Sequence, residues 1–177
     1  MSTSLKKWAF LLLGLTCIQG IRAQAYPPAG PANEVKFNAG SFLVLGALEF
    51  GYEHYLNQDV SLGGTLYWDN DPGDYNGDFG IGPALRAYFG YQPRSGFFAE
   101  AFGLYNKGEE EVSDGSAPPV TERYDSFALG LGVGSKWATR SQRFTLEIFG
   151  GLGRNLNPEP FQETFLYRAG LSVGFRF

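Results

Sequence analysis

The chain has 177 residues, the length of one domain, and its 44% hydrophobic and 16% aromatic content excludes an intrinsically disordered protein. Its 18 acidic residues outnumber its 14 basic residues, which argues against a nucleic-acid-binding role. The longest apolar run, Trp8 to Cys17, is shorter than the roughly 20 residues of a membrane-spanning helix, so a bundle of such helices is also excluded.

The first 23 residues have the pattern of a secretory signal peptide. A basic pair at positions 6 and 7 precedes the apolar run, and small residues at Ala23 and Ala25 offer cleavage sites. We therefore predict a signal peptide over residues 1–23 and export of the mature chain across the inner membrane.

The segment after the signal peptide, residues 24–33, contains three prolines and no periodic apolar pattern. We expect it to be an extended periplasmic tether. Cys17 is the only cysteine and lies inside the signal peptide, so the mature chain has no thiol for a disulfide, a nucleophile or a zinc ligand.

From Val35 onward, apolar residues recur at every second position, which is the period of a half-buried β-strand. In the last segment Phe165, Leu171 and Phe175 share one face, while Arg168 and Arg176 lie on the other. The predicted strands span residues 34–44, 47–56, 60–69, 78–89, 96–106, 124–138, 143–154 and 164–177.

The predicted connections differ in length between the two ends of the strands. Short connections at 57–59, 90–95 and 139–142 alternate with long ones at 70–77, 107–123 and 155–163, whereas the first connection, near Leu45, is short. Tight turns at one end and long loops at the other are typical of outer-membrane barrels, whose smallest usual strand number is eight. The predicted fold is an eight-stranded antiparallel up-and-down transmembrane β-barrel over residues 34–177.

A soluble, lipocalin-like barrel is the alternative fold, and it would have its apolar face inside. Three features favour the membrane barrel: polar faces rich in glycine that suit a narrow interior, a terminal aromatic residue, and aromatic residues near strand ends, where interfacial girdles lie. These aromatic residues are Trp68, Tyr88, Phe89, Tyr91, Trp137, Phe144 and Phe177.

The chain resembles small Gram-negative outer-membrane barrels. Its last strand is similar to the C-terminal assembly signal of such proteins, with Phe177 as the terminal aromatic residue. More narrowly, it resembles an uncharacterised family of Bacteroidetes-type outer-membrane proteins at residues 33–38, 52–56, 86–89, 95–100 and 151–155. The resemblance implies location in the cell outer membrane and contact with its lipids, with lipopolysaccharide and with the barrel-assembly machinery. It implies no activity.

Charged residues on the polar strand faces are expected to point into the barrel, because an outward Arg or Lys at the bilayer midplane costs about 2–4 kcal/mol. The residues predicted inside are Lys36, Glu53, Arg86, Glu100, Lys136, Glu147, Arg168 and Arg176. Hairpin geometry predicts three neighbouring pairs: Arg86 with Glu100, Lys136 with Glu147, and Lys36 with Glu53.

Two functions are compatible with these charges. An eight-stranded barrel is only wide enough for side chains to fill it, which favours a closed core of ion pairs and a structural or surface-interaction role through the loops. The alternative is a narrow solute channel with a ring of charges.

A third hypothesis is an enzyme that modifies the acyl chains of lipid A through His54, the only histidine. The alternation along its strand places His54 on the face that is expected to contact lipid, near the end with the short turns. Sites of lipid A enzymes face the outer leaflet instead. We therefore predict that the protein is not an enzyme.

No cofactor or metal site is predicted. The glycine clusters near Gly80, Gly132 and Gly151 lie inside strands with no helix after them, unlike phosphate-binding loops. The acidic loop from Asp69 to Asp78 has oxygen donors suited to Ca²⁺ but not the spacing of an EF-hand. The loop around residues 109–122 is also acidic and is a candidate for partner binding.

Overall fold

The computed structural model describes residues 30–69, 77–90, 92–112, 120–158 and 163–177. The predicted signal peptide and most of the predicted tether lie outside these residues. Strands and a short helix make up the described elements: β1 (Asn33–Asn38), α2 (Ala39–Leu45), β2 (Leu48–Tyr55), β3 (Val60–Trp68), β4 (Phe79–Tyr88), β5 (Gly96–Val112), β6 (Val120–Ala138), β7 (Phe144–Asn155) and β8 (Phe165–Arg176).

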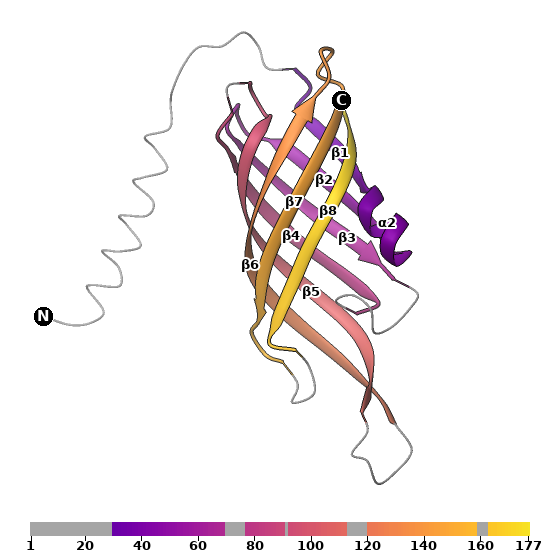
Figure 1. Cartoon of the computed structure of the whole chain (residues 1–177). Helices are drawn as coiled ribbons and strands as arrows, with labels where there is room; N and C mark the ends of the chain where they lie inside the picture. The colour runs from indigo at the N-terminus through magenta and orange to yellow at the C-terminus, as the bar shows by residue number, and fades with distance from the viewer. Residues whose placement is uncertain (1–29, 70–76, 91, 113–119, 159–162) are drawn as a thin grey trace, which may run out of the picture.

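The strands form one closed antiparallel sheet in chain order, as Figure 1 shows. The sheet closes where β1 pairs with β8, from Glu34 opposite Arg176 to Asn38 opposite Ser172. Beyond this register the main-chain N–H groups of Asn33 and Phe177 each donate to the carbonyl of the other, at 3.2 and 2.9 Å. The predicted eight-stranded up-and-down barrel is confirmed.

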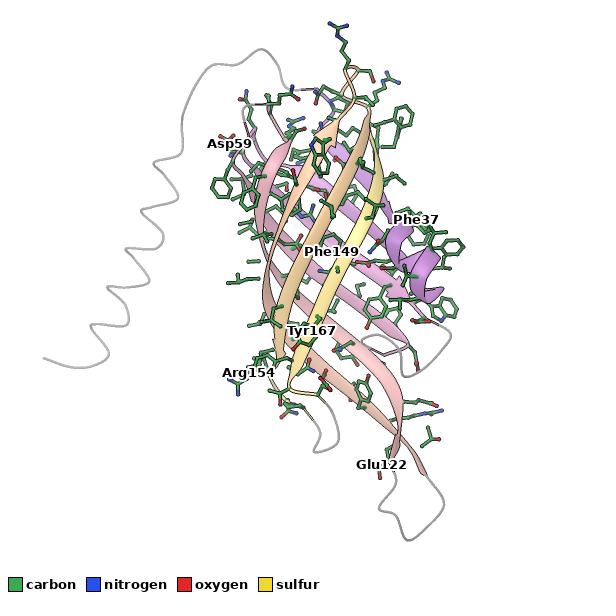
Figure 2. All side chains as sticks on the ribbon, viewed as in Figure 1. Phe37, Asp59, Glu122, Phe149, Arg154 and Tyr167 are labelled. Carbon is green, nitrogen blue, oxygen red and sulfur yellow. The ribbon has the colours of Figure 1, made fainter. Side chains whose placement is uncertain are left out.

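Side chains alternate between the interior and the outer face along the strands (Figure 2). In β7, for example, Thr145 and Glu147 are buried, whereas Leu146 and Ile148 are about half exposed. Most of the polar residues on the strands face inward and most of the large apolar residues face outward. This arrangement is the reverse of a soluble barrel, whose apolar side chains fill the interior.

The first predicted strand, 34–44, is wrong beyond Asn38, where the chain turns into helix α2. The side chain of Asn38 accepts a hydrogen bond from the N–H of Ser41 at 3.1 Å, and Gly46 ends the helix with a left-handed φ of 77°. The helix packs against β8 and β2, the two strands that pair with β1, and so lies beside the sheet where β1 ends. In the part of the chain that the structure describes, no helix is long and apolar enough to cross a membrane.

The long connection predicted at 107–123 is also partly wrong, because β5 and β6 continue through much of it. Their pairing runs from Gly96 opposite Lys136 to Val112 opposite Val120. This hairpin reaches past the ends of the other strands (Figure 1). Its extension beyond Lys107 therefore projects from the barrel as a two-stranded ribbon.

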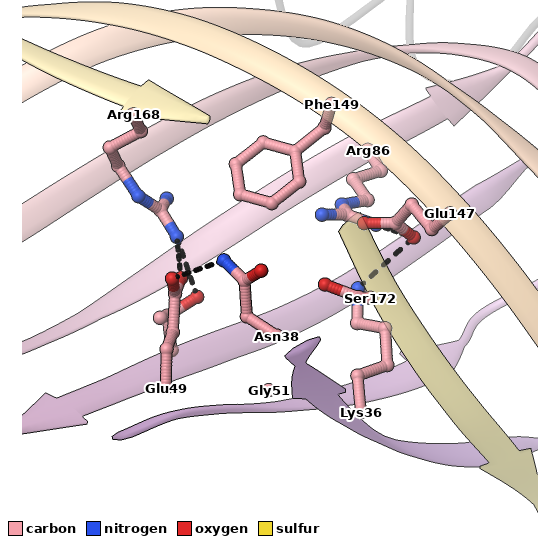
Figure 3. A pocket seen from close by; sticks show the side chains of 10 residues that line it. Lys36, Asn38, Glu49, Gly51, Arg86, Glu147, Phe149, Arg168 and Ser172 are labelled. Carbon is pink, nitrogen blue, oxygen red and sulfur yellow. Dashed lines mark hydrogen bonds and ion pairs between the residues drawn. The ribbon is translucent and has the colours of Figure 1, made fainter. Parts of the chain in front are cut away.

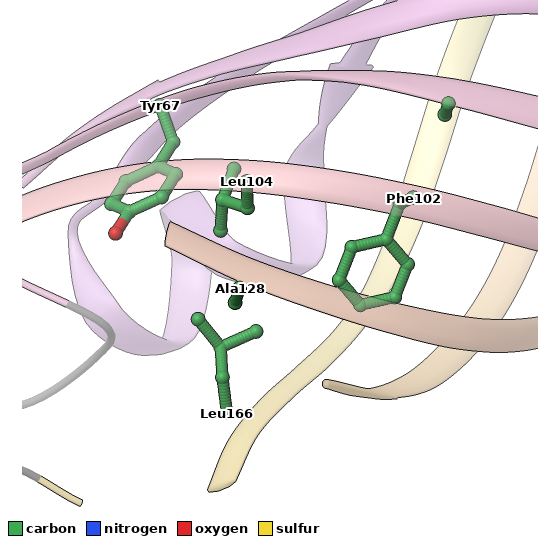
Figure 4. Packing of buried hydrophobic residues seen from close by; sticks show 6 residues of the cluster. Tyr67, Phe102, Leu104, Ala128 and Leu166 are labelled. Atoms are coloured by element: carbon green, nitrogen blue, oxygen red, sulfur yellow. The ribbon is translucent and has the colours of Figure 1, made fainter. Parts of the chain in front are cut away.

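Apolar side chains fill the interior at two levels. Near the long-loop end, Phe102, Leu104 and Leu166 pack with Tyr67 and two alanines (Figure 4). Nearer the short turns, a second cluster joins Tyr55, Tyr88 and Phe98, with Phe149 packed against it. Tyr88 is only 4% exposed, so its expected place in an outer girdle is wrong, and Tyr91 lies outside the described residues.

Candidate functional site

Of the groups of functional side chains considered from the sequence, the interior charged residues are the group that the described chain brings together. The side chain of Lys36 is 10% exposed, and the other seven predicted interior residues are more deeply buried. The members come from strands β1, β2, β4, β5, β6, β7 and β8. Together with Glu34, which pairs with Arg176 and Lys136, they form one connected network of ion pairs across the barrel.

The ammonium group of Lys136 lies at the centre of this network. Its Nζ atom is 3.2 Å from Glu34 Oε1, 2.8 Å from Glu53 Oε2 and 3.2 Å from Glu147 Oε2. The three carboxylates have oxygens within 4.8 Å of one another, the kind of donor set that can hold a metal ion. Lys136 already occupies the space between them, and Tyr55 accepts a further hydrogen bond from its Nζ at 3.1 Å.

Glu34 is a member of the network that the sequence analysis missed. It is fully buried, and it also accepts hydrogen bonds from Arg176 Nε at 2.8 Å and from the hydroxyl of Tyr55. Glu34 lies two positions before Lys36, so by the alternation of the strand it falls on the same face as Lys36, which the sequence analysis places inside. That parity is the signal that could have identified it.

The predicted opposition of Arg86 and Glu100 is confirmed by the β4–β5 register, and the two side chains form an ion pair. Arg86 also contacts Glu147 at 2.7 Å and Glu53 at 3.4 Å. Its guanidinium group lies over the ring of Phe98, 4.4 Å from the centroid. Arg86 therefore joins the central carboxylates to those nearer the long-loop end.

The other two predicted pairs also form, with small differences in register. Lys136 lies directly opposite Glu147, where a near-diagonal position was expected. Lys36 lies opposite Gly51, yet its Nζ atom reaches diagonally to Glu53 at 3.0 Å.

Arg168 forms the part of the network nearest the long loops. Its Nη2 atom is 2.8 Å from Glu49 Oε1, and Asn38 donates to the second oxygen of Glu49 at 2.7 Å (Figure 3). A small polar cavity of about 20 Å³ lies between these residues and Lys36, and a second cavity of about 10 Å³ lies beside it. Each has room for about one water molecule.

The short-turn end of the barrel is covered by the connection between β4 and β5. Arg94 is buried there, stacks over the ring of Tyr55 at 4.9 Å, and donates to the carbonyl oxygens of Gly30 and of Pro31, the latter at 2.7 Å. Arg176 donates in turn to the carbonyl of Arg94 at 2.5 Å. The side chain of Arg94 thus ties the start of the described chain to the barrel mouth.

The network is balanced in charge as well as dense. Among the described residues, its anions are Glu34, Glu49, Glu53, Glu100 and Glu147, and its cations are Lys36, Arg86, Lys136, Arg168 and Arg176. Because each of these residues has an oppositely charged partner within 3.4 Å, the arrangement is consistent with a closed interior that ion pairs hold together. The apolar clusters add bulk to the same interior.

The acidic loops are described only at their bases. Of the candidate Ca²⁺ loop, residues 70–76 lie outside the described residues, while Asp69 is buried and Asp78 is half-buried. Burial, together with nearby Glu109 and Asp69, raises the pKa of Asp78, and its Oδ1 atom has no hydrogen-bond partner. On the ribbon, Arg123 donates to Glu109 at 2.6 Å in an exposed pair.

His54 and Phe177 both lie on the outer face. The Nδ1 atom of His54 is 2.8 Å from Asn33 Oδ1, which also accepts a hydrogen bond from Tyr52 at 2.8 Å. His54 is close to the short turns, at the end where the sequence places it. Phe177 follows β8 directly and is 56% exposed.

Comparison with one solved structure supports the fold. The N-terminal β-barrel domain of OprF from Pseudomonas aeruginosa is similar with a TM-score of 0.59 and 19% sequence identity, over 82% of this chain and 95% of that domain. Neisserial surface protein A (NspA) gives a TM-score of 0.46 and 13% identity, over 82% and 93% of the two chains. No protein-family model and no curated protein sequence matches the chain, so the resemblance to a Bacteroidetes-type family stays a prediction.

Proposed function

We propose that this protein is an outer-membrane β-barrel with a closed, charge-paired interior, which acts as a structural or surface-interaction protein through its long loops. The proposal includes no catalytic role. It rests on the fold that the chain shares with the OprF barrel domain and on the composition of its outer face.

The uncharged outer face is the observation that carries the proposal. Between the aromatic residues at its two ends, the outward-facing strand positions of the described chain contain no Asp, Glu, Lys or Arg. Such a band is typical of barrels in a bilayer, where aromatic girdles lie at both interfaces. The aromatic residues are Phe89, Phe97, Trp137, Phe144, Phe175 and Phe177 near the short turns, and Trp68, Phe127, Phe165 and Tyr167 near the long loops.

Cell fractionation tests the location. We expect the mature protein in the outer-membrane fraction, with gel migration that changes on heating because a closed barrel resists unfolding in detergent. Recovery mainly from the soluble periplasm would contradict the proposal.

The surface role is tested through the long loops, which face the outside of the cell in this class of barrel. A pull-down from intact cells should compare the full chain with variants that lack residues 70–77 or residues 109–123. Loss of a captured partner from either variant supports the role. If all three chains capture the same proteins, this would argue against partner binding by these two loops.

The channel alternative has less support, because ion pairs and two apolar clusters fill much of the described interior, and the two cavities between the charged side chains hold about one water molecule each. We expect no conductance in planar bilayers. A stable single-channel current from the purified protein would make the channel the leading hypothesis.

A further inference from the structure

An apolar groove with a volume of about 580 Å³ lies on the outer face, over strands β1 to β4. We call it the Gly64 groove. It has the size of a small-molecule site, for which volumes of about 300–1,000 Å³ are typical. Its walls are the side chains of Val35, Phe50, Tyr52, Leu62, Leu66 and Ile81.

Gly64 is the reason for the hollow. It occupies an outward position on β3, between Leu62 and Leu66, where the alternation would otherwise place a large apolar side chain. Its neighbours across the sheet are Tyr52 and Pro83. The missing side chain leaves a groove whose floor includes Gly63 and Gly64, and whose lining extends from β1 to β4.

The groove has a polar end and an apolar end. His54 lines it on the side of the short turns, with Asn33 and Tyr52 in hydrogen-bond contact beside it. From His54 to Phe50 on β2 the walls extend for roughly 13 Å, at about 3.3 Å per residue, and Leu66 and Ile81 border the far part. Lys36 is the charged residue among those that line this groove, and its ammonium group points into the barrel, where it donates to Glu53 at 3.0 Å and to Glu147 at 3.4 Å.

We propose that the Gly64 groove binds one acyl chain of a membrane phospholipid, with the headgroup region at Asn33 and His54. This inference rests on the proposed outer-membrane location, because the groove is continuous with the uncharged band that would face the bilayer. A lipid has the same polarity along its length: a polar headgroup at the interface and an apolar chain beyond it. The short-turn end assigns the lipid to the periplasmic leaflet, whose lipids are glycerophospholipids.

Native mass spectrometry of the full mature protein in detergent micelles, with added dioleoylphosphatidylethanolamine, tests the site. Gly64→Leu fills the groove from its floor, and Leu66→Trp fills it from its wall without altering the glycine. An added Cβ at Gly64 lies 3.2 Å from the carbonyl oxygen of Gly82, so Leu66→Trp tests the groove without that close contact. Gly150→Leu is the control for replacing an outward glycine by leucine. Gly150 is an outward glycine on β7, outside the groove, where the nearest atom to an added Cβ is 4.0 Å away.

We expect one retained phospholipid on the wild type and on Gly150→Leu. Gly64→Leu and Leu66→Trp should each weaken retention at least about tenfold, equivalent to 1.4 kcal/mol. His54→Leu should weaken it less, because the groove remains. Equal retention by wild type and both groove variants would overturn the site, as would a dimer that only the groove variants lose. Unchanged retention by His54→Leu would overturn the headgroup placement.

Insertion into vesicles and heat-modifiable migration are measured on the same five proteins. If all insert but none retains lipid selectively, the groove inference fails and the proposed location stands. If the wild type does not insert, the proposed location itself fails.

Discussion

At the scale of single residues, the interior depends on the compensation of buried charges. Glu100 contacts Arg86 and Arg168, and removing its carboxylate leaves Arg86 without its nearest anion. Breaking a buried pair costs about 3–5 kcal/mol, whereas replacing both partners by apolar groups can be nearly neutral. In the double variant Glu147 keeps Lys36 and Lys136 as partners, so the rest of the network stays compensated.

We therefore expect Glu100→Ala to lower the free energy of unfolding by about 3–5 kcal/mol, and Arg86→Met with Glu100→Leu to lower it much less. Urea unfolding in micelles measures both. A single variant as stable as the wild type, together with an altered conductance, would indicate that these side chains lie in water and would favour the channel.

Lys136 should be the most sensitive cation. Lys136→Met keeps most of the side-chain volume and leaves Glu34, Glu53 and Glu147 without the ammonium that separates them. We expect a loss of at least about 3–5 kcal/mol in the same unfolding assay. Arg140→Met, at an exposed turn, is the control and should change stability by less than about 0.5 kcal/mol. Equal effects of the two substitutions would contradict the central role of Lys136.

The raised pKa of Asp78 predicts a pH dependence at the loop end. Because the folded protein binds this proton more tightly than the unfolded chain, the carboxyl group lowers stability as the pH rises through the raised pKa. Asp78→Asn should therefore stabilise the protein at neutral pH, by less than about 1 kcal/mol, and have less effect in acid. A stabilisation that is larger in acid than at neutral pH would contradict this sign.

At the scale of secondary-structure elements, helix α2 is held by its first and last residues. Asn38 caps the helix through Ser41 N–H and also donates to Glu49. Asn38→Ala should cost about 0.5–2 kcal/mol in urea unfolding, the usual cost of a lost N-cap. Ser41→Ala is the matched control, because it keeps the capped N–H and removes only a 3.4 Å contact with Glu49. A larger effect of Ser41→Ala would show that the cap is not the important interaction.

At the scale of the whole molecule, barrel closure depends on the short seam between β1 and β8. Phe177 is the last residue of this seam, where its main chain pairs with Asn33, and its side chain is exposed at the end with the short turns. Its resemblance to an assembly signal adds a second reason for its importance. Deletion of Phe177, or Phe177→Asp, should strongly reduce the yield in the outer-membrane fraction. An unchanged yield would argue against both reasons.

The sequence by itself determined the strand count, the inward and outward faces and most of the interior charges. A period of two assigns every second side chain to the same face, so Lys136 and Glu147 could be placed inside without coordinates. The opposition of Arg86 and Glu100 followed from the length of one tight turn. These features depend on neighbours along the chain or across one hairpin.

Only the tertiary structure decided what depends on several strands at once. The change from β1 to α2 depends on the space between β8 and β2, which the helix occupies. Residues 39–45 are mostly apolar, so the spacing of their apolar residues does not distinguish a strand from a helix. The contacts of Lys136 with Glu34, Glu53 and Glu147 join strands β1, β2, β6 and β7, because side chains from all around a narrow barrel meet near its axis. The Gly64 groove likewise exists only once β1 to β4 lie side by side, since a missing side chain becomes a hollow only when its neighbours form walls.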